Sequence, residues 1–165
     1  MRLITLFTFF IILLAPANVF AAELPIAESV LVEKSARKMY LIHDGKKYRE
    51  YTISLGDSPK GHKKQEGDEK TPEGSYVLDF RNPKSKYHLS IHINYPNKED
   101  KQQAKDRGVS PGGDIFIHGL PNGFGSTPSA FVERDWTDGC IAVMNDEIEE
   151  MWKLVKNGTP IEIRP

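Results

Sequence analysis

The chain contains a single cysteine, Cys140, so no disulfide can join two parts of it. A fold without internal cross-links has to be held together by its hydrophobic core. Setting aside an N-terminal segment of 21 residues leaves 144 of the 165 residues, enough for one ordinary domain with a single core. Because the chain has only one cysteine, its thiol has no partner within the chain. In an exported protein such a thiol is surplus, reactive or both.

The N-terminus has the pattern of a secretory signal. Arg2 gives a positive start, an apolar run covers residues 3–14, and residues 19–21 form a small-residue cleavage site. The alternative is a membrane anchor, but spanning a bilayer takes about 20 apolar residues. We therefore predict a signal peptide over residues 1–21 and one domain over residues 22–165, exported to a periplasm or cell-wall space without a stable membrane span.

The charge balance argues against a nucleic-acid partner. Without Arg2, the remaining chain carries 21 basic and 23 acidic residues. Proteins that bind the phosphate backbone usually carry a clear excess of positive charge. A nearly neutral chain therefore predicts a different kind of partner.

Short apolar runs separated by turns predict a mainly β (α+β) fold. Asp44-Gly45 between two such runs is a hairpin signal. One clear helix near the C-terminus is predicted, with Asn145 as its N-cap and apolar residues at helical spacing after it. Residues 98–107 read as a short exposed helix or a loop. The predicted strands lie at residues 30–32, 39–42, 48–55, 74–78, 89–93, 114–118, 141–143 and 161–163.

Two long segments rich in glycine and proline interrupt the strands, at residues 56–74 and 119–136. Loops of this length inside a compact domain are usually functional or disordered. The second loop lies between a strand that ends on His118 and the turn that contains Cys140. The sequence therefore places this second loop between the two candidate residues.

Cys140 and His118 are the residues best suited to nucleophilic chemistry. A cysteine attacks as its thiolate, and a neighbouring imidazole can take the thiol proton. The spacing of 22 residues from His118 to Cys140 allows two neighbouring strands joined by the intervening loop. Gly139 permits a tight turn in which its amide and that of Cys140 form an oxyanion hole. The alternatives are a small buried core cysteine and a structural histidine.

Other titratable residues could take part in such a site. His88 and His92 would share one face of a strand and could bind zinc together with His118 or Cys140. No acidic residue sits between them in the manner of an HExxH motif, and we predict no metal and no cofactor. If Asp138 faces the sulfur, its charge raises the pKa of the thiol. The alternative is that Asp138 is a turn residue that makes a local backbone hydrogen bond. His43 and His62 read as surface turn residues.

Four segments occur in a fixed order along the chain: Gly67–Tyr76, Ile91–Asn97, Ile117–Gly119 and Thr137–Val143. Taken together they resemble the L,D-transpeptidase catalytic domain of the YkuD type, and the resemblance covers residues 29–165. The family pattern is a histidine, a spacer and then Ser/Thr-His-Gly-Cys. This chain has Asp138 in place of the second histidine and a slightly long spacer, which makes it similar to a Thr-Asp-Gly-Cys branch that includes enzymes that cut.

The resemblance implies a β-sandwich or barrel-like fold with the cysteine in a cleft. It implies Cys140 as nucleophile, His118 as general base and the Gly119 carbonyl as the group that orients the base. Thr137, Trp136, Asp138 and Phe124 are expected to contact substrate.

The implied activity is acyl transfer on peptidoglycan stem peptides. An acyl-enzyme on Cys140 would release the terminal D-alanine and pass the acyl group to an amine, including one on a wall-attached protein. The alternatives are a hydrolase of the same fold, either an L,D-carboxypeptidase or an amidase that releases a wall-attached protein, and a non-catalytic module that binds the cell wall.

Overall fold

A computed structural model of the chain describes residues 24–131 and 134–165. The predicted signal over residues 1–21 lies outside the described residues. Within the described part of the chain, no helix is both long and apolar enough to cross a bilayer.

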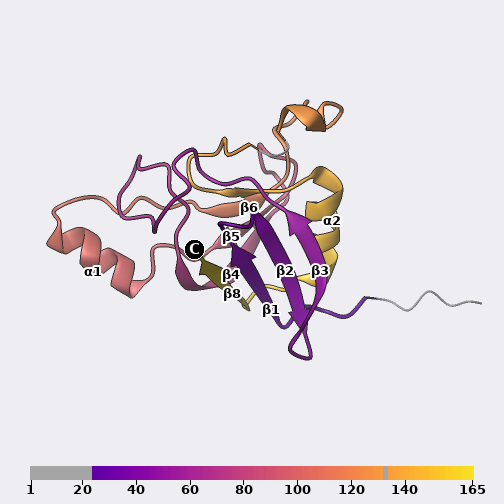
Figure 1. Cartoon of the computed structure of the whole chain (residues 1–165), viewed down its shortest axis with the longest axis horizontal. Helices are drawn as coiled ribbons and strands as arrows, with labels where there is room; N and C mark the ends of the chain where they lie inside the picture. Colours follow the sequence, from indigo (N-terminus) through magenta and orange to yellow (C-terminus); the bar gives the residue numbers. More distant parts are fainter. Residues whose placement is uncertain (1–23, 132–133) are drawn as a thin grey trace, which may run out of the picture.

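One curled eight-stranded sheet dominates the structure, in the order β3-β2-β1-β8-β4-β5-β6-β7 (Figure 1). The prediction of a mainly β fold with a helix near the C-terminus is confirmed. The strands are β1 (Ser29–Glu33), β2 (Lys38–His43), β3 (Lys46–Thr52), β4 (Gly74–Asn82), β5 (Ser90–Ile93), β6 (Phe116–His118), β7 (Ile141–Ala142) and β8 (Thr159–Arg164).

The strands form where apolar residues alternate along the chain. Val30 and Val32 of β1 are buried, and they pair in a parallel register with Ile161 and Ile163 of β8, which are also buried. Alternation of this kind places every second side chain on the core face of a sheet. The two ends of the domain therefore meet in the middle of the sheet.

The β2–β3 hairpin turns at the predicted Asp44-Gly45 pair. Both residues have positive φ angles, 48° and 67°, as a two-residue hairpin turn with the twist of its strands requires. This prediction is confirmed.

The described residues contain two α-helices, α1 (Lys98–Asp106) and α2 (Asn145–Leu154), and one 3-10 turn, η1 (Pro128–Ala130). Residues 98–106 thus form a helix, one of the two readings that the sequence left open. Asn97 caps α1 and Asp100 completes a capping box.

Helix α2 begins one residue earlier than its predicted cap. Met144 occupies the N-cap position, and the Glu147 carboxylate accepts a hydrogen bond from the Met144 N–H at 2.8 Å. Asn145 does not cap the helix because its Oδ1 accepts a hydrogen bond from the Leu120 N–H, also at 2.8 Å. The helix start therefore ties down the loop that follows β6.

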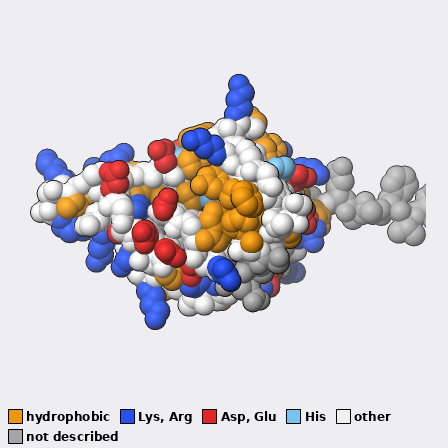
Figure 2. Space-filling model, turned by 90° about the horizontal axis from the view of Figure 1, so that it is seen from above, with side chains coloured by type: hydrophobic (Ala, Val, Ile, Leu, Met, Phe, Trp, Pro, Cys, Tyr) orange, Lys and Arg blue, Asp and Glu red, His pale blue; other side chains and the backbone are white. Residues whose placement is uncertain are grey.

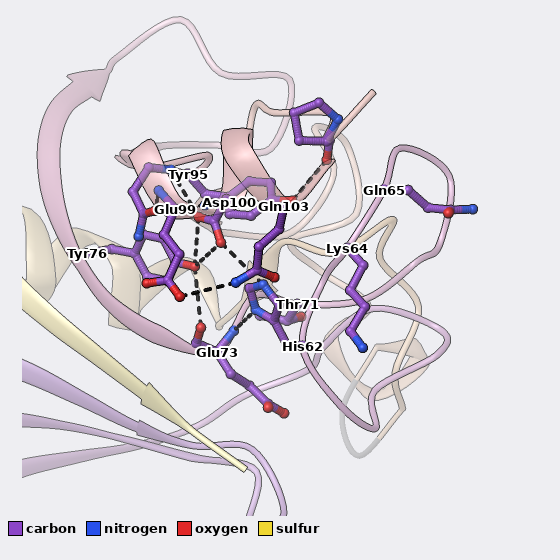
Figure 3. A network of polar contacts seen from close by, with 12 residues as sticks. His62, Lys64, Gln65, Thr71, Glu73, Tyr76, Tyr95, Glu99, Asp100 and Gln103 are labelled. Carbon is purple, nitrogen blue, oxygen red and sulfur yellow. Dashed lines mark hydrogen bonds and ion pairs between the residues drawn. The ribbon is translucent and has the colours of Figure 1, made fainter. Parts of the chain in front are cut away.

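Figure 3 shows a buried carboxylate that joins α1 to the loop of residues 56–74. Asp100 is only 5% exposed and accepts hydrogen bonds from the Tyr76 hydroxyl at 3.1 Å and from the Asn97 N–H at 2.9 Å. His62 Nε2 lies 3.2 Å from the same carboxylate, while its Nδ1 accepts the Glu73 N–H at 3.0 Å. The reading of His62 as a surface turn residue is wrong, because its ring bridges the loop and the helix.

Hydrophobic side chains also reach the surface. The face in Figure 2 has a central group of them with acidic side chains beside it. Large hydrophobic side chains that are exposed include Phe80, Tyr87 and Phe124. Exposed apolar groups that gather on one face often mark a binding site.

Replacing Asp100 with alanine should destabilise the fold by about 3 kcal/mol, because it leaves buried hydrogen-bond donors without an acceptor. Asp106→Ala, an exposed change in the same helix, is the matched control and should cost less than about 0.5 kcal/mol. Urea unfolding of both variants measures the difference. Equal stabilities would show that the carboxylate does not hold the loop.

Candidate active site

The sheet brings Cys140 and His118 to adjacent strands. β6 and β7 run parallel, with Ile117 opposite Ile141 and His118 opposite Ala142. Cys140 directly precedes β7 and so lies beside Phe116 at the start of β6. Both predicted residues line one cavity of about 660 Å³. Its other walls include Asn82, Lys84, Ser85, Lys86, Tyr87, Ser90, Asp114 and Asp138.

The Cys140 thiol is partly exposed to this cavity. The Phe116 N–H donates to Sγ at 3.4 Å, and the thiol donates in turn to the Asp114 carbonyl at 3.6 Å. Burial raises the pKa of the thiol to about 11, and the nearby charges of Asp138 and Asp114 act in the same direction. The resting sulfur is therefore protonated at neutral pH.

His118 is buried, and one of its ring nitrogens makes a hydrogen bond with the backbone. Nδ1 lies 2.7 Å from the Gly119 carbonyl oxygen. A carbonyl can only accept, so Nδ1 carries the proton and the neutral ring keeps a free electron pair on Nε2. Burial lowers the pKa of His118 to about 4, although the hydrogen bond to Gly119 opposes that shift.

Together these pKa shifts make the resting pair neutral. A thiol with a raised pKa faces an imidazole with a lowered one, so an ion pair is disfavoured at neutral pH. Such a pair can still react if the imidazole removes the thiol proton as the sulfur attacks. The orientation of His118 through Gly119 suits it to that task.

The turn before the cysteine is held by Thr137. This buried hydroxyl accepts the Gly139 N–H at 3.2 Å and donates to the Cys140 carbonyl at 2.8 Å. The Gly139 amide, which was predicted to point at an oxyanion, thus has a partner inside the turn. Thr137, which was predicted to contact substrate, makes its hydrogen bonds within the turn.

Backbone from the loop of residues 56–74 packs directly on this turn. Gly139 has a φ of 122°, and a Cβ built on it would lie 2.6 Å from the Lys70 carbonyl oxygen. A Cβ on Gly56 would lie 2.0 Å from the Glu69 carbonyl oxygen and 3.0 Å from the Gly139 Cα. The backbones at Gly56, at residues 69–70 and at Gly139 therefore lie so close together that no side chain fits between them.

The remaining predicted residues occupy different places. Asp138 lines the cavity. The Trp136 ring lies 5.7 Å from the His118 ring, edge to face. Phe124 is 51% exposed and packs on Phe131 at 5.7 Å, and it is not among the described residues that line the cavity.

Sequence reasoning missed Tyr87 and Asp114. Tyr87 belongs to a loop between β4 and β5 with no motif of its own, so only the three-dimensional fold reveals it. Asp114 follows Gly112 and Gly113 and has a φ of 55°. The glycine pair ahead of an apolar strand was the available signal for this strained position, whose carbonyl accepts from the thiol.

The structure directs the histidines of the zinc alternative to other partners. His88 Nε2 lies 2.7 Å from the Glu149 carboxylate, and His92 Nδ1 lies 2.6 Å from that of Asp79. Residues Glu28, His43 and Asp44 form a small group that could hold a metal ion near the β2–β3 hairpin. Such exposed groups are common, and this one lies outside the cavity of Cys140.

Comparisons with known proteins agree with this geometry. The L,D-transpeptidase catalytic domain family, YkuD, matches residues 27–163. The helical cell shape determining protein Pgp2 from Campylobacter jejuni is 33% identical, with a TM-score of 0.61, over 82% of this chain and 46% of that one. Bd1075 from Bdellovibrio bacteriovorus is 30% identical, with a TM-score of 0.56, over 84% and 48%.

A more distant solved structure shows the fold alone. An L,D-transpeptidase from Mycobacterium smegmatis is 14% identical, with a TM-score of 0.54, over 82% of this chain and 58% of that one. A search of curated proteins found no match. The chain spans about half the length of Pgp2 and Bd1075.

Gly139→Ala should displace Cys140, because a methyl group there meets the Lys70 carbonyl and strains the backbone. We expect the rate of thiol alkylation by a bulky electrophile to change at least about tenfold, with about 1–3 kcal/mol lost in stability. Gly158→Ala is the matched control, since Gly158 has a φ of 92° but a Cβ there would meet nothing within 4 Å. Wild-type reactivity in Gly139→Ala would contradict the close packing.

Proposed function

The chain belongs to the YkuD family of L,D-transpeptidase catalytic domains, and from that premise we propose that it acts on peptidoglycan stem peptides through an acyl-enzyme on Cys140. The family and the similarity to a cell-shape protein support a peptidoglycan-related activity. The observation that carries the finer proposal is the shared cavity of Cys140 and His118, with the imidazole oriented by the Gly119 carbonyl.

The first chemical step joins sulfur to carbon. His118 Nε2 takes the thiol proton while Sγ attacks the carbonyl of the third stem residue. The oxyanion that forms needs hydrogen-bond donors, and we assign this role to the Cys140 amide, since Gly139 N–H already donates to Thr137. The tetrahedral intermediate collapses as His118 returns the proton to the leaving nitrogen, and D-alanine departs.

The second step frees the enzyme. An acceptor amine attacks the thioester, His118 removes a proton from that amine, and His118 then gives this proton to the departing Cys140 sulfur, which restores the thiol and the neutral imidazole. The product is a new amide bond between two stems, or between a stem and a wall-attached protein. Because peptidoglycan lies outside the cytoplasm, this function requires the export that residues 1–21 predict.

Hydrolysis is the second candidate, and the character of the cavity favours it. Its walls carry the polar side chains of Asn82, Lys84, Ser85, Asp114 and Asp138. Transfer to an amine requires that water be kept from the thioester until the acceptor binds. Cys140 is partly exposed to this cavity, so water can reach the thioester, and the chain would then trim stems as an L,D-carboxypeptidase or release a wall-attached protein.

Defined stem tetrapeptides, incubated with and without an acceptor amine, should separate these reactions. We expect a covalent adduct on the wild-type protein by mass spectrometry, a joined product if transfer dominates and a tripeptide if water does. Cys140→Ala should form no adduct, while its thermal unfolding stays cooperative. Phe124→Ala, a change outside the cavity, is the matched control.

Adduct formation by a folded Cys140→Ala protein would remove the thiol from the mechanism. Absence of any adduct or product from the wild-type protein, with a thiol that also resists small electrophiles, would favour a non-catalytic module that binds the wall.

A further inference from the structure

Tyr87 covers one face of the His118 imidazole. The centroids of the two rings lie 4.4 Å apart, with the planes inclined by 34°. Trp136 approaches the same imidazole at 5.7 Å with its plane at 68°. The histidine ring is thus held by two aromatic neighbours from different loops, at separations typical of favourable aromatic pairs.

The backbone of Tyr87 is tied to the residue that orients the imidazole. Gly119 N–H donates to the Tyr87 carbonyl at 3.1 Å, while the Gly119 carbonyl faces His118 Nδ1. On the other side, Tyr87 N–H donates to the Ser85 hydroxyl at 3.0 Å. Gly119 itself cannot shift easily, because a Cβ there would lie 2.6 Å from Asn145 Oδ1. Ring packing and backbone hydrogen bonds therefore hold Tyr87, Gly119 and His118 in a fixed arrangement relative to one another.

Exposure shows which side of this arrangement faces the cavity. His118 is 3% exposed, whereas Tyr87 is 38% exposed and lines the cavity beside Cys140. The tyrosine ring therefore takes the solvent contact that the imidazole would otherwise have. Removing the ring would open one face of the histidine to water.

We propose that Tyr87 is a positioning residue for His118: its ring shields the imidazole from water, and its carbonyl, together with that of Leu89, holds the N–H of Gly119, the residue whose own carbonyl sets the tautomer. The role is defined for the proposed thiol chemistry and so rests on the proposed function. A shielded, neutral imidazole with a fixed Nδ1–H remains a competent base at Nε2 under mildly acidic conditions, where an exposed histidine would be protonated.

Charged groups around the histidine do not provide an alternative explanation. Asp114 lies in the segment just before β6 and Asp138 in the turn before β7, while Lys84 and Lys86 belong to the β4–β5 loop, and all four line the same cavity as the Cys140 thiol. Within the described residues, none of these forms an ion pair with His118. Shielding from water therefore dominates, as burial is also the larger cause of the low pKa of His118.

An NMR titration that follows the chemical shifts of the His118 ring protons with pH tests whether Tyr87 shields the imidazole. It does not require turnover. The wild-type and Tyr87→Phe proteins should titrate near pH 4, whereas Tyr87→Ala should shift the pKa by about one to two units toward the ordinary 6.5. His118→Gln assigns the signal, and Tyr40→Ala, a tyrosine change on β2, is the matched control. An unshifted His118 pKa in folded Tyr87→Ala would overturn the proposal.

Activity on a stem peptide gives the second readout. The acid limb of kcat/KM reports protonation of the base in the free enzyme. If the pKa rises to about 6, Tyr87→Ala should lose about tenfold at pH 5 relative to its own plateau, and Tyr87→Phe should restore the wild-type limb. A uniform loss at every pH would indicate a merely structural role and would overturn the proposal.

Tyr87→Leu carries the same test if Tyr87→Ala does not fold. Leucine covers less of the imidazole, so a smaller rise in the His118 pKa is expected, and a wild-type value would count against the proposal. Because the NMR titration does not depend on substrate, an inactive protein with the expected pKa shifts would reject the proposed function while leaving the shielding of His118 in place.

Discussion

The close approach of the loop of residues 56–74 to the turn before Cys140 is the contact on which the site depends. Backbone carbonyls of Glu69 and Lys70 occupy the space where side chains on Gly56 and Gly139 would stand. This packing fixes the direction in which the chain enters β7. The position of the sulfur follows from it, because Cys140 comes directly after Gly139. Asp100 and His62 then hold the same loop against α1.

The electrostatics of the site follow from its depth in the sheet. His118 ends β6 and is covered by aromatic rings, so it loses solvent and stays neutral. Cys140 is also shielded and has two carboxylates nearby, which keep the proton on the sulfur. The proposed reaction therefore starts with removal of the thiol proton by His118 during attack, and the thiol does not rest as an ion pair. A protonated resting thiol is also less prone to oxidation.

Much of the fold was readable from the sequence because apolar alternation and turn residues specify strands locally. The Asp44-Gly45 hairpin is an example, since aspartate and glycine are residue types that favour the positive φ angles of such a turn. Contacts that form only in three dimensions were not readable. Asn145 resembles a helix cap but binds the Leu120 amide, and His62 resembles a surface turn residue but meets a buried carboxylate.

The candidate site shows the same division. The Thr-Asp-Gly-Cys turn and the strand ending on His118 pointed to Cys140 and His118 as the candidate pair, and the structure brings both to one cavity. The family resemblance implied that Phe124 contacts substrate, yet Phe124 lies outside the cavity and packs on Phe131. Tyr87 was missed because its contact with His118 joins two loops that no motif connects.

The most direct test of this account is the ionisation of the single thiol, followed by the ultraviolet absorbance of its thiolate across a pH series. With His118 neutral and the sulfur shielded, the absorbance should rise only in strongly alkaline solution, with a pKa of about 11. A thiolate already present at about pH 6, and lost in His118→Gln, would reveal a thiolate–imidazolium pair and contradict the neutral resting state.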